Sequence, residues 1–307
     1  MYLPKTIHRN AKTIAMPSAM LVGVLLHRPI TMLEIWTHQM ITPTLIFLML
    51  FVTFCRVKPH QMRLSSMHGW LLLFQIVMSL GVYGLLRPFD GVVAQGAMIC
   101  ILAPVAMAAV VIGGMLGANV ATMATFSLLC NMAIALLSPI ILTFTGSGEC
   151  TFTQILARVA PLLIMPFAMA QCCRLFVPKA AQWIGDHSLI SFYMWLISLI
   201  VIIGRTTTFI LDLHNASLAT ETWLAVSALV ICLVQFKVGR MIGRRYGDPP
   251  AGGQSLGQKN TVLAVWMAQS FLDPIASIAP TAYIVWQNLV NSYQIYRQER
   301  EKIISGK

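Results

Sequence analysis

The sequence predicts an all-α integral membrane protein with about ten transmembrane helices. Hydrophobic residues make up 57% of the 307 residues and charged residues only 10%, whereas charged residues make up about 25% of an average soluble domain. The apolar residues also gather in runs of roughly 20 residues, the length that an α-helix needs to cross the hydrocarbon core of a bilayer. The connections between these runs are too short to fold alone, so no separate soluble domain is expected.

Ten apolar runs qualify as candidate spans. In chain order, their centres lie near Val22, Phe47, Met78, Met107, Cys130, Ile164, Leu199, Val230, Leu263 and Val285. An even number of spans places both ends of the chain on the same side of the membrane.

The basic residues test this topology, because cytoplasmic loops of membrane proteins collect Lys and Arg. With a cytoplasmic N-terminus, the outside gaps hold only Arg28, Arg87, Arg158 and Arg205, and Lys259 lies within the membrane. The inside segments then hold all the others: Lys5, Arg9, Lys12, Arg56, Lys58, Arg63, Arg174, Lys179, Lys237, Arg240, Arg244, Arg245, Arg297, Arg300, Lys302 and Lys307. The pattern predicts a multi-pass protein of the cell inner (plasma) membrane with both termini in the cytoplasm. It also explains the net charge of +11 without nucleic acid, for which no aromatic-interleaved basic motif is present.

The N-terminus could also be read as a secretory signal, since Lys5, Arg9 and Lys12 precede the apolar run Ile14–Leu26. Cleavage there would place the basic loop after Cys55 outside the cell. The charge distribution therefore favours a retained first span.

Five spans precede the segment around Gly148 and five follow it. A repeat with an odd number of spans must insert its second copy upside down, as in many secondary transporters. The sequence thus predicts two inverted repeats, residues 1–148 and 149–307.

The ninth span begins with an unusually polar, glycine-rich stretch, from Gly252 to Asn260, which places Lys259 inside the bilayer. A buried ammonium there costs about 2.5–3.5 kcal/mol, and irregular backbone at membrane depth requires surrounding protein or a water-filled cavity. We therefore expect a binding site at a broken helix. The alternative is that Lys259 lies near the end of the span and extends its ammonium to the interface.

The fourth span, the symmetry partner of the ninth, carries Pro104 in its middle and Gly113-Gly114 after it. Proline removes a helix hydrogen bond and disfavours helix just before it, so this span is expected to be interrupted, although an ordinary kink would explain Pro104 alone. Two interrupted helices that cross would direct the positive ends of two half-helices at one point, which suits an anion.

The order of the spans, Pro104 in the fourth and Gly257-Gln258-Lys259-Asn260 in the ninth resemble the bile acid:sodium symporter family over most of the chain. The resemblance implies a panel domain (spans 1, 2, 6 and 7) and a core domain (spans 3–5 and 8–10) with crossing, unwound fourth and ninth spans. It also implies an organic anion as substrate: a bile acid, a steroid conjugate or a small carboxylate.

The family's ninth-span motif is Glu-x-Gly-x-Gln-Asn, and the chain matches it only in part. Gly257 and Asn260 match, whereas Ser255 stands in place of the sodium-binding glutamate and Lys259 in place of the glutamine. The substrate-binding residues implied here are Lys259, Asn260, Gly257 and Pro104. The ion-coupling candidates are Lys259, Gln75, Ser127, Asn131, Ser255 and Gln258.

A fixed ammonium disfavours sodium at this position. At 4 Å and an effective dielectric of 20, two unit charges repel by about 4 kcal/mol, roughly a thousandfold in affinity. We therefore expect that Lys259 replaces the sodium ion, that no metal or other cofactor is bound, and that a proton can serve as the coupling ion. Binding of an anion favours the charged amine, whereas burial favours the neutral one.

Three functional classes are considered: a sodium-independent transporter, a sodium-coupled symporter of the same kind, and a membrane sensor or enzyme that uses Lys259. An enzyme needs a partner group within hydrogen-bond reach, and the nearest acid in the sequence is Asp273, at the far end of the same span. Transport by alternating access, without catalysis, is therefore favoured. The expected partners are the organic anion and the lipid bilayer; the oligomeric state is open and compatible with a monomer.

The tenth span places amides on one helical face, at Gln287, Asn288, Asn291 and Gln294. They could line a polar seam against the core domain or simply satisfy their neighbours. The second, structural role is favoured.

Overall fold

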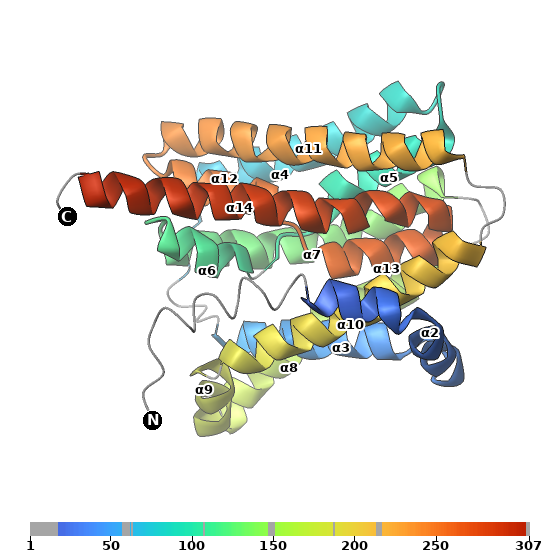
Figure 1. The fold of residues 1–307 in the computed structure, drawn as a ribbon. Helices are drawn as coiled ribbons and strands as arrows, with labels where there is room; N and C mark the ends of the chain where they lie inside the picture. The colour runs from blue at the N-terminus through green and yellow to red at the C-terminus, as the bar shows by residue number, and fades with distance from the viewer. Residues whose placement is uncertain are drawn as a thin grey trace. The chain divides into compact units, whose positions relative to one another are not determined.

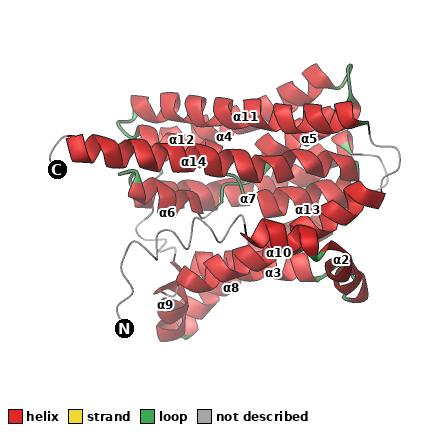
Figure 2. Cartoon of the chain, in the orientation of Figure 1, coloured by secondary structure: helices red, strands yellow, loops and turns green. Residues whose placement is uncertain are grey.

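The computed structural model describes residues 18–56, 62, 64–106, 108–146, 151–186, 188–212 and 217–304. Every element in this part of the chain is a helix (Figures 1 and 2). The boundary expected between the repeats at residue 148, the centre expected at Met107 and the basic residues Lys5, Arg9, Lys12, Lys58, Arg63 and Lys307 lie outside the described residues.

Four helices are long and apolar enough to cross a membrane: α4 (Ser66–Leu86), α7 (Val120–Thr145), α8 (Phe152–Phe176) and α11 (Leu218–Arg245). A bent helix pair near the N-terminus would make a fifth span. The chain is thus a multi-pass membrane protein by helix length and composition, but the ten spans expected from the sequence are not confirmed. Interrupted helices explain part of the difference between the expected spans and the long helices, because each piece is too short to cross a membrane alone. Helix α5, for example, has 12 residues and is only about 18 Å long.

Two compact units make up the chain. Unit 1 combines Met1–Arg56 with Met165–Ala216, and unit 2 combines Val57–Ile164 with Ser217–Lys307. Each unit is therefore built from two separate stretches of sequence.

In unit 1, a helix over Ser18–Leu25 bends by 76° into α2 (His27–Trp36). The candidate span expected around Val22 is therefore a bent pair of helices. Beyond α2, unit 1 holds α3 (Ile41–Arg56), the second half of α8, α9 (Pro178–Asp186) and α10 (Ser188–Asp212). Helix α10 runs through Arg205, whereas the topology predicted from the basic residues places Arg205 in an outside gap.

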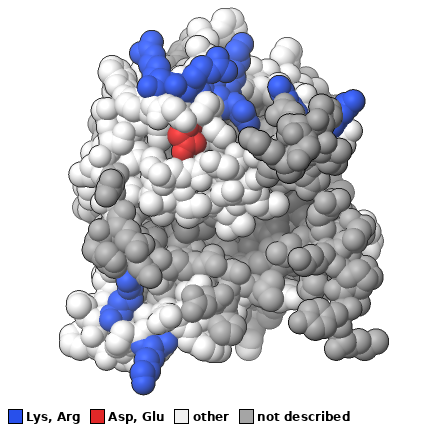
Figure 3. Space-filling view, turned by 90° about the vertical axis from the view of Figure 1, so that its left-hand side faces the viewer, with Lys and Arg blue, Asp and Glu red and all other residues white. Residues whose placement is uncertain are grey.

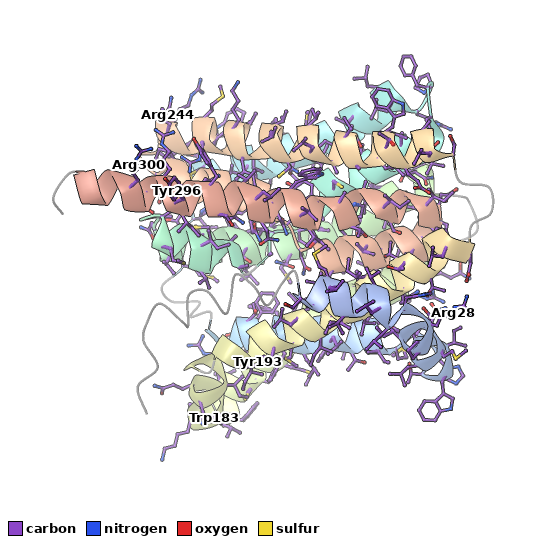
Figure 4. All side chains as sticks on the ribbon, in the orientation of Figure 1. Arg28, Trp183, Tyr193, Arg244, Tyr296 and Arg300 are labelled. Carbon is purple, nitrogen blue, oxygen red and sulfur yellow. The ribbon has the colours of Figure 1, made fainter. Side chains whose placement is uncertain are left out.

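Glycines let the helices of unit 1 approach closely. A Cβ at Gly23 would lie 2.8 Å from the Ile200 carbonyl oxygen, and one at Gly204 would lie 2.9 Å from the end of the Ile30 side chain. Large side chains such as Trp183 and Tyr193 point outward from α9 and α10 (Figure 4), as expected for surfaces that meet lipid or the membrane interface.

Unit 2 holds α4, α5 (Gly91–Leu102), α6 (Ala108–Met115), α7, the first half of α8, α11, α12 (Pro249–Gly257), α13 (Thr261–Phe271), a 3-10 turn η2 (Pro274–Ser277) and α14 (Ile278–Ile304). Side-chain caps fix where several of these helices begin. Asp90 accepts hydrogen bonds from the amides of Val92 and Val93 at the start of α5, and Asp248 accepts one from Ala251 at the start of α12.

The core of unit 2 lies where α5, α11 and α14 pack together. Small residues of α5 such as Ala97 and Cys100 are buried against Ala228 and Cys232 of α11 and Tyr283 of α14. Small side chains allow helices to approach closely where no hydrophobic force drives them together in lipid.

Helices α11 and α12 approach each other closely at Gly239, Gly243 and Gly252. A Cβ at Gly252 would lie 2.2 Å from the Gly239 carbonyl oxygen and 2.8 Å from the Gly243 Cα. Both contacts are with backbone, which cannot rotate out of the way. These glycines therefore fix the position of α12, the helix that leads to Lys259.

Basic residues gather at one end of unit 2, where α11 ends and α14 nears its end. Arg244, Arg300 and Tyr296 lie together there (Figure 4), and the same end shows a concentration of Lys and Arg with little Asp or Glu (Figure 3). The two helices thus end on the same side of unit 2.

Candidate functional site

The first half of the candidate site is the interruption between α5 and α6. Helix α5 ends at Leu102, and Ala103 turns to an extended conformation (φ −48°, ψ 137°) directly before Pro104. Proline restricts the preceding residue in this way, and it has no N–H to donate to the Cys100 carbonyl. The helix resumes as α6 at Ala108.

The second half is the interruption between α12 and α13. Helix α12 ends at Gly257, Gln258 is extended (φ −92°, ψ 96°), and Asn260 caps α13 by accepting a hydrogen bond from the Leu263 amide at 3.2 Å. A Cβ at Gly257 would lie 2.4 Å from the Phe236 ring. The glycine therefore allows α12 to pack on α11 directly before the break.

The two interruptions pair with each other. The Ala106 amide donates to the Gln258 carbonyl at 2.9 Å, and the Asn260 amide donates to the Pro104 carbonyl at 2.8 Å. Val105 and Lys259 thus form an isolated antiparallel β-bridge. Each break supplies the hydrogen-bond partners that the other lacks, which removes a cost of several kcal/mol for each unpaired backbone group in an apolar interior.

Lys259 lies at the centre of this pairing. Its side chain is only 1% exposed, its Nζ donates to the Ile101 carbonyl at 2.9 Å, and its backbone amide donates to Gln287 Oε1 at 3.0 Å. Ile101 belongs to the last turn of α5, whose carbonyls carry the negative end of the helix dipole. The ammonium therefore sits where a helix end attracts a cation.

Other side chains satisfy the remaining carbonyls at the end of α5. Gln75 Nε2 donates to the carbonyls of Leu102 and Ala103 at 2.9 and 3.0 Å, and Gln235 Nε2 donates to that of Cys100 at 3.4 Å. The carbonyl groups at the end of α5 thus have hydrogen-bond donors in the apolar core, supplied by polar side chains from α4, α11 and the α12–α13 break.

Amides of α14 hold the α12 side of the site. Gln254 Nε2 donates to Asn291 Oδ1 at 2.9 Å, Asn291 Nδ2 donates to Gln258 Oε1 at 2.5 Å, and Gln294 Oε1 accepts from Arg240 at 2.9 Å. Amides on this face of α14 therefore bond to side chains of α12 and α11, as in the polar seam that was the less favoured of the two roles considered from the sequence. Asn288 is an exception, since it bonds to the Ile284 carbonyl of its own helix.

The candidate residues expected from the sequence fall into two groups. The paired breaks bring together Pro104, Gly257, Gln258, Lys259 and Asn260, and Gln75 joins them through the end of α5.

Ser127, Asn131 and Ser255 are also buried in unit 2. Asn131 donates to the Ser127 carbonyl at 2.7 Å, while Asn131 Oδ1 and Ser255 Oγ have no hydrogen-bond partner within the described residues. Within the described residues, no hydrogen bond joins Asn131 or Ser255 to Lys259.

Some residues of the site were not singled out from the sequence. Tyr283 donates to the Gly257 carbonyl at 2.9 Å and accepts from Gln235 Nε2 at 3.0 Å; Cys130 donates to Gln75 Oε1 at 3.4 Å. Gln235 carried a usable signal, because an amide within an apolar span usually faces protein. The Ile101 carbonyl carried none, since a backbone group has no sequence pattern.

No protein-family model matches the chain, and no curated protein matches it. The resemblance to the bile acid:sodium symporter family therefore stays a prediction from the residues quoted for it.

Within the described residues, no group of three or more His, Cys, Asp or Glu side chains is placed to hold a metal ion. The hydrogen-bond partner of Lys259 Nζ is instead the backbone carbonyl oxygen of Ile101. This carbonyl belongs to the last turn of α5, and the lysine ammonium is the cation that contacts it.

Proposed function

We propose that the protein is a secondary transporter of an organic anion that works by alternating access without sodium, with Lys259 in the place of a coupling cation. The observation that carries the proposal is the contact of a buried ammonium with the carbonyl end of an interrupted helix, at the point where a second interrupted helix pairs with it. Interrupted helices of this kind form the substrate and ion sites of many secondary transporters.

The carbonyl end of α5 supports the cation part of the proposal. Sodium would compete for the same oxygens, but the ammonium would repel it by about 4 kcal/mol at 4 Å and an effective dielectric of 20. The lysine can gain or lose a proton at Nζ, which makes a proton the candidate coupling ion. A permanently charged lysine would instead make the protein a uniporter or exchanger.

The helices that resume after the breaks support the anion part. α6 and α13 begin directly after the paired segment, and helix N-termini attract anions. Asn260 adds a donor at this position: it is partly exposed, and because its Oδ1 is the atom that caps α13, Nδ2 is the donor of the same amide group. We assign the substrate contact to Asn260 and the start of α13, with Lys259 as the positive charge behind them.

The two compact units support the assignment of a panel domain to unit 1 and a core domain to unit 2. Alternating access requires two bodies that each keep their own packing. The inverted repeat, residues 1–148 and 149–307, belongs to the same proposal.

The basic end of unit 2 supports the membrane orientation. Arg244 of α11 and Arg300 of α14 lie at this end, and membrane proteins keep such clusters on the cytoplasmic side. We therefore place the C-terminal end of α14 in the cytoplasm of a cell with the protein in its plasma membrane.

Sodium replacement tests the coupling. We expect uptake into proteoliposomes to change by less than about twofold when NaCl is replaced with choline chloride, because sodium has no role in the proposed cycle. A tenfold loss of uptake would already correspond to about 1.4 kcal/mol of sodium linkage. The measurement is initial uptake of each anion in a panel of bile salts, steroid sulfates and small carboxylates. A steep dependence on sodium would contradict the proposal that Lys259 takes the cation's place.

Asn260 tests the anion contact. Asn260→Ser keeps an oxygen that can cap α13 but removes Nδ2, so we expect the affinity for a transported anion to fall by roughly 1–3 kcal/mol while the melting temperature changes little. Asn260→Ala should lose the same affinity and also about 1 kcal/mol of stability, because the cap is lost. Unchanged affinity in a folded Asn260→Ser variant would place the substrate elsewhere.

A further inference from the structure

A second set of polar and charged side chains lies in unit 1, on α2, α3 and α10. Glu34 is the buried residue of α2, with 1% exposure, while its neighbours Met32 and Trp36 are 70% and 79% exposed. A helix that buries a carboxylate and exposes its large apolar side chains is oriented by polar contacts, which makes the carboxylate a candidate for function.

The two oxygens of Glu34 differ in their surroundings. Oε1 accepts hydrogen bonds from the hydroxyl of Thr42 at 2.5 Å and from its amide at 3.3 Å. Oε2 is buried and has no hydrogen-bond partner in the described part of the chain. An unpaired oxygen on a buried carboxylate is costly, and it is the atom available to take a proton.

Arg205 of α10 faces this carboxylate but does not bond to it. Its NH1 lies 3.8 Å from Glu34 Oε1, and its side chain is 16% exposed. This distance is longer than a hydrogen bond, and the described residues give the guanidinium no other ion pair. The donors of Arg205 are therefore available to a ligand that carries a carboxylate or sulfonate, the groups that a guanidinium binds in a fork.

Further donors lie beside this pair on the same two helices. Thr31 donates its hydroxyl to Thr208 at 2.9 Å, and His27 Nδ1 lies 3.0 Å from the same oxygen. Thr31 precedes Glu34 by three residues and Thr208 follows Arg205 by three, so each pair lies on one face of its helix. The cluster combines one acid with several hydrogen-bond donors.

We propose that Arg205 binds the anionic group of a ligand when Glu34 takes up a proton. In the empty state, the ionised carboxylate and the guanidinium neutralise each other. In the loaded state, the proton is on Glu34 Oε2, and the ligand's negative charge replaces that of Glu34 beside Arg205. The cluster is neutral in both states, so neither leaves an unpaired charge in the protein interior.

Other titratable groups near Glu34 do not duplicate this role. On its own helix, Arg28 is exposed and His27 is tied to Thr208. On α10, Asp212 is exposed and lies seven residues beyond Arg205; on α3, the charged residue is Arg56, at the opposite end from Thr42. His38 lies in the turn that follows α2.

This inference goes beyond the proposed role of Lys259, since it concerns a site in the other unit and can be tested by binding alone. Benzenesulfonate is a suitable probe, because it stays ionised over the whole working pH range and any pH dependence then belongs to the protein. We expect its affinity for the purified full-length protein to rise as the pH falls, by up to about tenfold for each pH unit, which is the slope for the uptake of one proton with the ligand.

Three variants separate the contributions. Glu34→Gln should bind the probe with the high affinity of the acidic limb at every pH. Arg205→Gln should lose binding at every pH, and Arg205→Lys, which keeps the charge without the fork, should bind more weakly but keep the pH dependence. Arg28→Gln and Asp212→Asn change exposed charges on the same helices and should behave like the wild type.

Infrared difference spectra provide a readout that does not depend on affinity. Addition of benzenesulfonate near the midpoint of the pH dependence should produce the C=O band of a protonated carboxyl group, and this band should be missing in Glu34→Gln.

The proposal is overturned if Glu34→Gln keeps the pH dependence of the wild type, or if binding is lost in Lys259→Met but not in Arg205→Gln. The double variant Glu34→Gln/Arg205→Gln, which leaves neither charge unpaired, checks that loss of binding is not loss of folding.

Discussion

Lys259→Met is expected to reduce uptake of the transported anion by about a hundredfold or more. A unit positive charge about 6 Å from a bound anion contributes about 2.8 kcal/mol at an effective dielectric of about 20, which corresponds to that factor. The variant should still fold, because the loss of one hydrogen bond to the Ile101 carbonyl, about 1–3 kcal/mol, is offset by the removal of a buried charge. The measurements are uptake in proteoliposomes and thermal unfolding in detergent.

Two further variants divide charge from proton transfer at this position. Lys259→Arg keeps the positive charge but cannot deprotonate, so it should bind the anion and move no protons, as a pH dye would show during substrate-driven uptake. Lys259→Ala removes the atoms of a propylammonium ion, and added propylammonium should restore part of the uptake if the buried site is reachable. Full activity of Lys259→Met would exclude this residue from the mechanism.

Gly252→Ala is expected to have the largest effect on stability. Its Cβ would lie 2.2 Å from the Gly239 carbonyl oxygen, so α11 and α12 would have to separate. Overpacking of a tight core costs about 1–3 kcal/mol, and because the three nearest atoms are all backbone atoms of α11, this site lies at or above the upper end. Because α12 leads directly into the break at Gln258, uptake should fall as well.

The matched control is Gly84→Ala in α4, where an added Cβ would meet nothing within 4 Å. It should leave the protein unchanged or stabilise it by up to about 1 kcal/mol, the difference in helix propensity between glycine and alanine. Unfolding can be followed with a thiol-reactive dye, since Cys55, Cys100, Cys130 and Cys232 are free and buried. Equal melting temperatures for the two variants would show that the α11–α12 contact is not rigid.

Local signals in the sequence predicted much of the candidate site. Pro104 and the glycine-rich start of the ninth run mark positions where a helix cannot continue, and helices α5 and α12 end there. A lysine within an apolar run indicated a buried cation, and Lys259 is buried. The helical class followed from composition and from the length of the apolar runs, and it is confirmed.

Other features depend on contacts between distant residues and could not be read from the chain. The pairing of Val105 with Lys259 joins segments more than 150 residues apart in sequence, and the oxygen that binds Lys259 Nζ is a backbone atom. The bend after Leu25 also had no clear signal, since Pro29 lies in the first turn of α2, where proline is tolerated. The ten expected spans are not confirmed, because a run of apolar residues does not show where its helix is interrupted or capped.

The bridge between the two breaks is made by main-chain atoms alone, which affects how such a site can change during evolution. Substitutions at Val105 and Ala106 leave the Ala106 N–H and the Pro104 carbonyl where they are, provided that the new side chains fit. The backbone geometry of the bridge can therefore be retained while the side chains at these positions change. Relatives of this chain could share the same crossing with few identical residues there, and covariation between the 104–106 and 258–260 segments would be weaker than their proximity suggests.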